Sequence, residues 1–369
     1  MKRKVVTAFL LSVLLGILSA GCGKEEQIEL PEPEPIQETV MEEEEPEEET
    51  VMEEEEPEDL HEGEALSPFT GEWIKPKIAK QRPVSCMIGN TTSALPQYGI
   101  GKADVIYEAP VEGGLTRLMG IFQDYKKIEK LGSVRSSRLY YAYYSQEFDA
   151  IYLHYGQAAY ATSFLESGQI DDLNGLEYTV DQAVIYRDTS KSAPHNAYAT
   201  GEGLQKGIEL KNYSTDYDSK DTHYLFASEE EPVELTDDSR TAKSVKPGYL
   251  INTPEFVYDK EDGLYYRFQY GDRHIDGNTN EQLTARNIII QNSNVRTLDE
   301  NGYLEIDTTG EGSGQFITGG KAIDITWKRS DVFSKTQYFD KNGNEITLNP
   351  GKTWVCIVDN SYLDRVVIE

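Results

Sequence analysis

The sequence contains little cysteine. Three cysteines occur in 369 residues, and only Cys86 and Cys356 lie beyond the first 22. Each of these two sits in an apolar run, where cysteine behaves as a small hydrophobic side chain of a buried strand. Two isolated cysteines make neither a disulfide framework nor a metal site. We expect the two in different domains, which disfavours a disulfide between them.

The sequence is also poor in positive charge. It has 35 Lys and Arg residues against 65 Asp and Glu, for a net charge of -30. A protein that binds nucleic acid without regard to its sequence needs a basic surface to contact phosphates. The charge excludes that class, and we expect no nucleic-acid partner. Residues 23–66 alone contain 21 of the acidic residues, so the rest is a mildly acidic globular chain. Its length predicts about two domains, at ~150 residues per domain.

The motifs of the common catalytic and metal sites are missing. There is no G-x-S-x-G nucleophile elbow, no S-x-x-K pair, no H-E-x-x-H zinc motif and no Walker phosphate loop. Residues 276–281 begin like a calcium loop, but the sixth position is Glu281 and the twelfth is Asn287. We interpret them as a turn. We therefore expect no cofactor and no metal, and the sequence identifies no catalytic residue.

The N-terminal apolar run is short. Residues 5–20 carry no charge, but a transmembrane helix needs about 20 apolar residues. The run follows the basic residues 2–4, which is typical of a secretory signal peptide. Residues 18–22, LSAGC, resemble the lipobox of bacterial lipoproteins, where the cysteine is lipidated and becomes the first residue. We predict a signal peptide over residues 1–22 and a lipid on Cys22. The chain is then anchored on the extracytoplasmic face of the membrane of a Gram-positive cell.

Residues 23–66 are rich in Glu and Pro. The segment ETVMEEEEPEE at 38–48 is followed by ETVMEEEEPED at 49–59, an 11-residue tandem repeat. Dense like charge with a proline in each unit cannot bury a core, so we predict a disordered stalk. It serves as a spacer between the membrane and the folded part. The alternative is that its Glu blocks bind cations or a cationic partner.

The remaining chain divides into two halves with different patterns. Residues 67–207 alternate β-branched apolar runs with helical spacing at 137–148 and 158–165, which predicts a mixed α/β sandwich. Residues 208–245 are a polar connection. Residues 246–369 contain three Asx-Gly pairs between aromatic or alternating runs, at 262–263, 301–302 and 342–343, which predict hairpins. We predict an α+β protein whose C-terminal domain is mostly antiparallel β.

Several segments together resemble a known family. They are RPVSCMIGN at 82–90, the stretches at 103–117 and 132–138, APHN at 193–196, TWK at 326–328 and LNPGKTW at 348–354. This set is similar to the YerB-like lipoproteins of Gram-positive bacteria, which pair an N-terminal and a C-terminal domain of unknown function. Gly89 departs from the pattern, where we expect Asp. The resemblance implies architecture and location, and no reaction.

Polar residues interrupt the apolar segments of the first half. Arg135 and Arg138 flank two serines at the predicted start of a helix, where backbone N–H groups and guanidinium groups both favour oxyanions. The candidate anion- or ligand-binding residues are Arg117, Arg135, Arg138, His154, His195 and Asn196. Glu108 and Glu112 are candidate acid/base groups or partners of these arginines. The alternative is a buried Arg–Glu network that fixes the fold. The tyrosines 140, 141, 143 and 144 form a candidate sugar-stacking face, and at helical spacing at least two belong to the core.

The leading hypothesis is a non-catalytic binding or scaffolding lipoprotein of the cell envelope. Its partners are the membrane, through the lipid anchor, and a cell-wall polymer or an envelope protein. The alternative is an envelope enzyme that acts on a phosphorylated or glycan substrate. Residues 103–107, 115–122 and 135–138 are similar in order to the core of LytR-CpsA-Psr phosphotransferases, although the Arg-Asp-Thr signature is missing after Val134.

Overall fold

An 11-stranded mixed sheet runs through both halves of the sequence. The structure, a computed structural model, describes residues 61–217, 222–236 and 238–369, so the predicted signal peptide, Cys22 and nearly all of the stalk lie outside the described residues. The order along the sheet is β12 (Arg240–Thr241), β22 (Lys321–Arg329), β21 (Gly310–Thr318), β18 (Asn287–Ser293), β25 (Thr353–Asp359), β4 (Val105–Pro110), β5 (Thr116–Phe122), β3 (Val84–Gly89), β7 (Ile151–His154) and β8 (Asp172–Asn174), with β23 (Gln337–Phe339) beside β22.

The two halves join where β25 pairs with β4. This pairing is parallel and aligns Thr353 with Val105 and Cys356 with Glu108. On its other edge β25 runs parallel to β18, while β21 is antiparallel to both of its neighbours, β18 and β22. In the first half β3 pairs antiparallel with β5 and parallel with β7. Strands far apart in the sequence therefore form one hydrogen-bonded surface.

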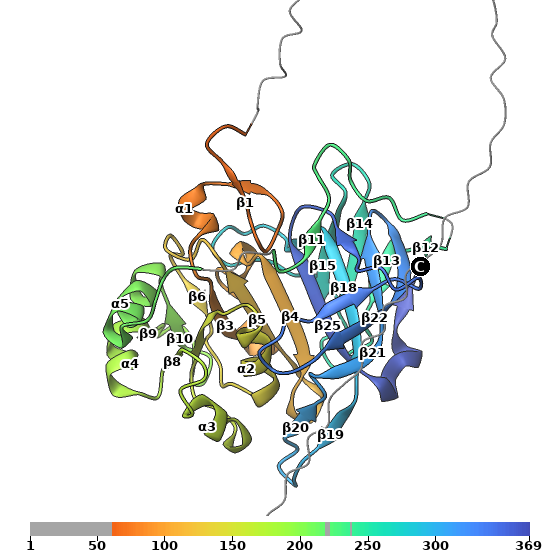
Figure 1. Cartoon of the computed structure of the whole chain (residues 1–369). Helices are drawn as coiled ribbons and strands as arrows, with labels where there is room; N and C mark the ends of the chain where they lie inside the picture. The colour runs from red at the N-terminus through yellow and green to blue at the C-terminus, as the bar shows by residue number, and fades with distance from the viewer. Residues whose placement is uncertain (1–60, 218–221, 237) are drawn as a thin grey trace, which may run out of the picture. The chain divides into compact units, whose positions relative to one another are not determined.

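Helices cover the part of the sheet that belongs to the first half. In Figure 1, α3, α4 and α5 lie beside β3 and β8, on the side away from β14, β15 and β22. The predicted helices at 137–148 and 158–165 are confirmed as α2 and α3. The bounds are α1 (Pro76–Ala79), α2 (Leu139–Gln146), α3 (Ala159–Leu165), α4 (Tyr178–Val184) and α5 (Gly201–Lys211), with short 3-10 helices η1 (Thr92–Ala94), η2 (Ile100–Lys102), η3 (Glu112–Gly114) and η4 (Asn360–Arg365).

A second sheet belongs to the later half. Its six strands are β16 (Asp272–Arg273), β15 (Leu264–Gln269), β14 (Glu255–Asp259), β13 (Ser244–Lys246) and β26 (Val367–Ile368), with β17 (Thr284–Ala285) beside β15. Gly263, at φ +72, lies in the β14–β15 hairpin turn, and Gly302, at φ +78, lies between β19 (Val295–Thr297) and β20 (Leu304–Ile306). Asn342 and Gly343 lie in a turn closed by the Phe339–Glu345 bridge. The three predicted turns and the predicted α+β class are confirmed.

The central sheet is buried on both faces. Alternate residues of β3 enter different cores: Cys86 packs with α4, α5 and the six-stranded sheet, while Met87 packs with the tyrosines of α2. This explains why β3 reads as a continuous apolar run, which is typical of a strand covered on both sides. Cys86 and Cys356 are both buried and free. The remaining short strands are β1 (Ala65–Leu66), β2 (Trp73–Ile74), β6 (Leu131–Gly132), β9 (Ile185–Arg187), β10 (Ala197–Ala199), β11 (Leu225–Phe226) and β24 (Thr347–Leu348).

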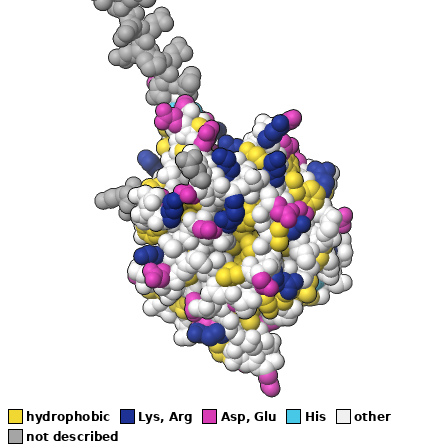
Figure 2. Space-filling model, turned by 90° about the vertical axis from the view of Figure 1, so that its right-hand side faces the viewer, with side chains coloured by type: hydrophobic (Ala, Val, Ile, Leu, Met, Phe, Trp, Pro, Cys, Tyr) yellow, Lys and Arg dark blue, Asp and Glu magenta, His cyan; other side chains and the backbone are white. Residues whose placement is uncertain are grey.

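The surface of the folded part mixes both signs of charge. Figure 2 turns toward the viewer the right-hand side of Figure 1, where β12, β13 and β22 lie. On this face Lys and Arg side chains alternate with Asp and Glu around patches of hydrophobic atoms. Within the described residues, no helix has the length and apolar character needed to cross a membrane.

Candidate functional site

The three predicted arginines come from two neighbouring segments. Arg117 is the second residue of β5, and Arg135 and Arg138 lie in the connection between β6 and α2. Backbone hydrogen bonds hold this connection on two sides. Arg135 N donates to the Met87 carbonyl of β3 at 2.9 Å, and the Arg135 carbonyl accepts from Tyr155 N at 2.9 Å. The arginines therefore project from a fixed stretch of chain.

Arg138 forms a bidentate ion pair with Glu112. Its Nε and Nη2 donate to the two carboxylate oxygens at 2.5 and 2.6 Å, and its Nη1 donates to the Ser137 carbonyl at 2.8 Å. Burial favours the neutral carboxyl, but the hydrogen bonds and charge of Arg138 outweigh it and lower the pKa of Glu112. The same pair raises the pKa of Arg138 against the effect of burial. The predicted role of Glu112 as an arginine partner agrees with this geometry.

Arg117 and Arg135 have no carboxylate partner among the described residues. Each donates to a backbone carbonyl, Arg117 to Ser136 and Arg135 to Pro194, the latter at 2.8 Å. Burial, followed by the charges of Arg138 and Arg135, lowers the pKa of Arg117 to about 10. Burial and the charge of Arg138 lower the pKa of Arg135 as well. We call Arg117, Arg135 and Arg138 the arginine cluster.

His195 lies beside this cluster. Its ring is half-buried, and its Nδ1 is buried without a hydrogen-bond partner in the structure. Burial and the charges of Arg135 and Lys191 lower its pKa, so the ring is neutral at pH 7. The neighbouring Asn196 turns to a different group, where its Oδ1 accepts from Arg187 Nη1 at 3.2 Å. Of this predicted pair, His195 is the one influenced by the charge of an arginine of the cluster, Arg135.

The structure does not bring His154 to the arginine cluster. The ring is fully buried at the end of β7. Its Nδ1 lies 2.8 Å from the Gly156 carbonyl and its Nε2 lies 2.9 Å from Asp172 Oδ2. Both ring nitrogens have partners within the protein and the ring is buried, so His154 links β7 to β8.

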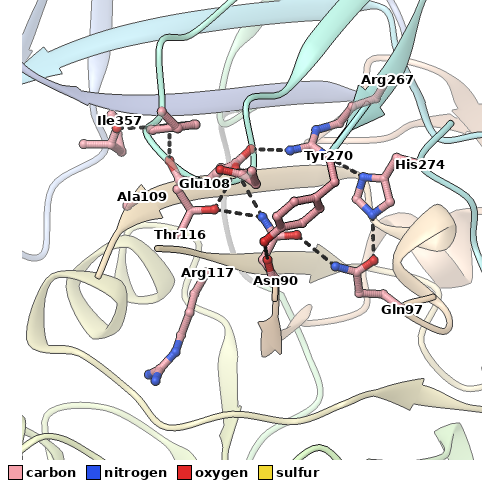
Figure 3. Close-up of polar contacts among 12 residues, drawn as sticks. Asn90, Gln97, Glu108, Ala109, Thr116, Arg117, Arg267, Tyr270, His274 and Ile357 are labelled. Carbon is pink, nitrogen blue, oxygen red and sulfur yellow. Dashed lines mark hydrogen bonds and ion pairs between the residues drawn. The ribbon is translucent and has the colours of Figure 1, made fainter. Parts of the chain in front are cut away.

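Glu108 also lies apart from the arginine cluster, in the centre of the molecule. Its partner is Arg267 of β15, whose Nη2 donates to Glu108 Oε2 at 2.7 Å, and both side chains are fully buried. Its other oxygen accepts from three donors: Thr116 Oγ1 at 2.8 Å, Asn252 Nδ2 at 2.7 Å and Asn90 Nδ2 at 3.2 Å. In Figure 3 these side chains converge on Glu108, whereas Arg117 points away from them. Both oxygens of Glu108 are therefore held by fold-internal donors in a fully buried position.

The hydrogen-bond network around Glu108 continues to a histidine. Arg267 Nη1 donates to His274 Nδ1, so the ring proton lies on Nε2 and is donated to Gln97 Oε1 at 2.6 Å. Gln97 Nε2 then donates to Asn90 Oδ1 at 3.0 Å, which closes the circuit visible in Figure 3. Burial, followed by the charge of Arg267, holds the pKa of His274 well below its usual range. The alternative of a buried Arg–Glu network thus applies to Glu108, whose arginine is Arg267, while Glu112 pairs with the predicted Arg138.

Arg267 is not among the residues predicted from the sequence, although the alternation of residues along its strand indicates that its side chain is buried. Along β15 the residues alternate, and Tyr265, Arg267 and Gln269 point to the buried side. An arginine in phase with buried residues of a half-buried strand requires a buried acceptor. The identity of that acceptor, 159 residues away, is not contained in the local pattern.

Comparison with known proteins places the chain in a family. Residues 69–214 match the "Protein of unknown function (DUF3048) N-terminal domain", and residues 245–355 match the DUF3048 C-terminal domain. The chain belongs to the DUF3048 family. It is 31% identical over 292 residues to "Putative lipoprotein YerB" of Bacillus subtilis (strain 168), which covers 79% of this chain and 86% of that protein. The predicted YerB-like family is confirmed.

A solved structure supports the same assignment. The crystal structure of YerB protein from Bacillus subtilis aligns with a TM-score of 0.73 at 31% identity, covering 83% of this chain and 99% of that one. Both polar groups described above lie within matched DUF3048 regions. The arginine cluster lies in the N-terminal match, and the Glu108–Arg267 pair joins the N-terminal match to the C-terminal one.

No grouping of three or more His, Cys, Asp or Glu side chains suited to a metal ion occurs in residues 61–217, 222–236 and 238–369 of this DUF3048 chain. The predicted calcium-like stretch is a turn in which Asp276 accepts backbone N–H groups from Gly99 at 3.1 Å, Gly101 at 2.7 Å and Asn278 at 2.7 Å. These bonds occupy the carboxylate oxygens that a cation would need.

Proposed function

We propose that this chain is a lipid-anchored, extracytoplasmic binding protein of the cell envelope, and that its arginine cluster binds an anionic group. The anchor is supported by the lipobox-like residues 18–22 and by the name of the relative, "Putative lipoprotein YerB". In this proposal the stalk spaces the folded part from the membrane, and the ligand is an anionic envelope polymer or an envelope protein.

The observation that carries the anion site is the uncompensated charge of the cluster. Of the three arginines only Arg138 has a carboxylate partner among the described residues, Glu112, in a chain whose net charge is -30. Burial is the main cause that lowers the pKa values of Arg117 and Arg135, and the like charges of the neighbouring arginines lower them further. A bound oxyanion would relieve this repulsion and accept charge-assisted hydrogen bonds from the free guanidinium nitrogens.

Free donors exist at the cluster. Arg117 and Arg135 each use one nitrogen on a backbone carbonyl, and none of their remaining nitrogens is both buried and unpartnered. Both side chains are partly exposed, in contrast to Arg267, which is fully buried and has no partner for its Nε. In this proposal the ligand contacts Arg117 and Arg135, while Arg267 serves the fold.

A binding role fits the carboxylates better than catalysis does. Glu108 accepts four hydrogen bonds in a fully buried position, and Glu112 is held in both oxygens by Arg138. General acid–base catalysis requires a side chain that can exchange a proton with the substrate. The hydrogen bonds to Glu108 and Glu112 disfavour that role for both.

The test of the anion site is a titration of the full-length chain with inorganic phosphate, followed by calorimetry or arginine N–H NMR signals. We expect Arg135→Ala to weaken binding by roughly 10- to 150-fold, equivalent to about 1.5–3 kcal/mol for a charged hydrogen bond. Its unfolding midpoint should stay near that of the parent, because the residue is half-buried and strands no carboxylate. Arg240→Ala, at an exposed arginine paired with Asp324, is the matched control. A parent that binds no phosphate would exclude the anion site.

The anchor is tested separately by mass spectrometry of the protein extracted from membranes. Wild-type protein should carry lipid mass on its N-terminal cysteine, and Cys22→Ala should be recovered without lipid. Unmodified wild-type Cys22 in the membrane fraction would contradict the anchor and leave the anion site untouched.

A further inference from the structure

A cavity of about 380 Å³ opens next to the arginine cluster. Its volume is within the ~300–1,000 Å³ typical of sites for small molecules. The cavity is formed by α2, the first turn of α3 and the residues around β20, so it draws on both halves of the sequence. Arg138, a member of the cluster, is one of its lining residues.

The lining is rich in tyrosine. Four rings contribute, from Tyr140, Tyr143, Tyr160 and Tyr303. Tyr160 is 44% exposed and meets the Tyr303 ring edge-on at 5.9 Å between centroids, and the Arg138 guanidinium lies 5.3 Å from the Tyr303 centroid. Tyrosine offers a rigid apolar face with a polar tip, which suits a ligand that has C–H faces and a hydroxyl rim. A pyranose ring is such a ligand.

Most of the tyrosines of α2 that were predicted as a candidate stacking face are buried. Tyr140, Tyr141 and Tyr144 are buried in the core, and only Tyr143 of the four is half-buried. Tyr160 and Tyr303, which sequence reasoning missed, supply the accessible rings. The aromatic surface is therefore assembled from three separate segments.

The charges around the cavity nearly cancel. Glu305 and Asp307 lie 2.6 and 3.7 Å from Arg296, and Arg138 is neutralised by Glu112. Such a lining disfavours an ion inside the cavity itself. Glu305 Oε1 has no partner among the described residues, and together with Thr308 and Thr309 it offers acceptors to hydroxyl groups. Neutral, hydroxyl-bearing ligand atoms fit these groups.

We infer that this cavity holds the sugar ring of a sugar phosphate unit, whose phosphate lies at the arginine cluster. Arg138 connects the two parts, because it lines the cavity and donates to the Ser137 carbonyl, next to the Ser136 carbonyl that accepts from Arg117. The inference rests on the proposed anion site and names its ligand class, a phosphorylated glycan. It assigns Tyr160 the ring-stacking role and the arginines the charge.

The experiment compares inorganic phosphate, glucose 1-phosphate and N-acetylglucosamine 1-phosphate as probes of the full-length chain by NMR titration. We expect at least one sugar phosphate to bind about 10-fold or more tightly than phosphate. Tyr160→Ala should remove that advantage and leave phosphate binding unchanged. Tyr178→Ala, at a tyrosine that is 79% exposed on α4 outside the cavity lining, should change neither value.

The possible results separate the two proposals. Phosphate binding with no gain for either sugar phosphate, or a gain that survives Tyr160→Ala, overturns the sugar site and leaves the anion site standing. Absence of binding by all three probes overturns both. Sugar-phosphate binding that is insensitive to Arg135→Ala overturns the anion site and, with it, the assignment of the phosphate.

Discussion

Asp104 and Glu108 are two nearby carboxylates with different numbers of hydrogen-bond partners. Glu108, within β4, accepts from Arg267, Thr116 and two asparagines. Asp104, just before β4, accepts one backbone N–H, from Gln123 at 2.6 Å, and its negative charge is stabilised by Lys352. Burial dominates at Asp104 and raises its pKa to about 7. Removing the negative charge should therefore change the stability of the protein in opposite directions at the two positions.

Neutralising Glu108 should destabilise the protein. Glu108→Gln leaves the buried Arg267 guanidinium without a counter-charge, and breaking a buried pair on one side costs about 3–5 kcal/mol. Denaturant unfolding of the variant should show this loss in the free energy of unfolding. Glu311→Gln, at a 73% exposed carboxylate paired with Lys328, should change it by less than about 1 kcal/mol. Equal stability of the two variants would contradict the structural role of Glu108.

Neutralising Asp104 should remove one specific contribution to the pH dependence of stability. The carboxyl ionises near pH 4 when unfolded and near pH 7 when folded, so the folded state binds more protons between these values. Stability from this group is present at low pH and is lost as pH rises toward 7. Asp104→Asn should therefore gain about 1–3 kcal/mol relative to wild type on going from pH 4.5 to pH 8.

Unfolding at the two pH values checks the Asp104 prediction, with the exposed Asp364→Asn as control. The buried His223 and His274, whose pKa values burial holds well below the usual range, act in the opposite direction. They destabilise the fold as pH falls below about 6.5, because only the unfolded state takes up their protons. This contribution is common to both proteins and cancels in the comparison. A constant difference between variant and wild type would disprove the raised pKa.

At the scale of elements, local sequence patterns predicted the helices and hairpin turns, because interactions between residues close in the sequence determine them. The spacing of Leu139 to Tyr144 gave α2, and Asp262-Gly263 gave the β14–β15 hairpin. The pairing of β25 with β4 joins segments about 250 residues apart, and no periodicity in either strand specifies its neighbour. The same limit applies to the site. Arg117, Arg135 and Arg138 were recognisable as unusual polar interruptions, whereas Arg267 as the partner of Glu108 was not.

The order of strands makes a prediction about the two cysteines. Cys86 on β3 and Cys356 on β25 are separated by β4 and β5, which is three strand spacings or about 14 Å. Disulfides require Cα atoms within about 7 Å, so the two cannot pair. Burial also raises the pKa of both thiols. Both should resist iodoacetamide in the native protein and react fully in guanidinium, as peptide mass mapping would show. Native labelling of either cysteine would contradict its burial.

At the scale of the whole molecule, the central sheet links the two matched family regions. β25 inserts between β18 of its own half and β4 of the other, and the Glu108–Arg267 pair spans the same junction. Tyr249 adds a further link, since its hydroxyl lies 2.8 Å from the Glu108 carbonyl and 3.0 Å from the Ile357 carbonyl. Few of these contacts could persist if either half opened alone.

This junction predicts that both halves unfold as one unit. In native-state hydrogen exchange of the full-length chain, the most protected amides of β3 and β5 should report the same opening free energy as those of β18 and β21. Glu108→Gln should lower both values by the same amount, about 3–5 kcal/mol, although Glu108 itself lies in the first half. Glu311→Gln should leave both unchanged. If β3 kept its protection while β18 lost it, the halves would be separable folding units and the shared sheet would contribute little to their coupling.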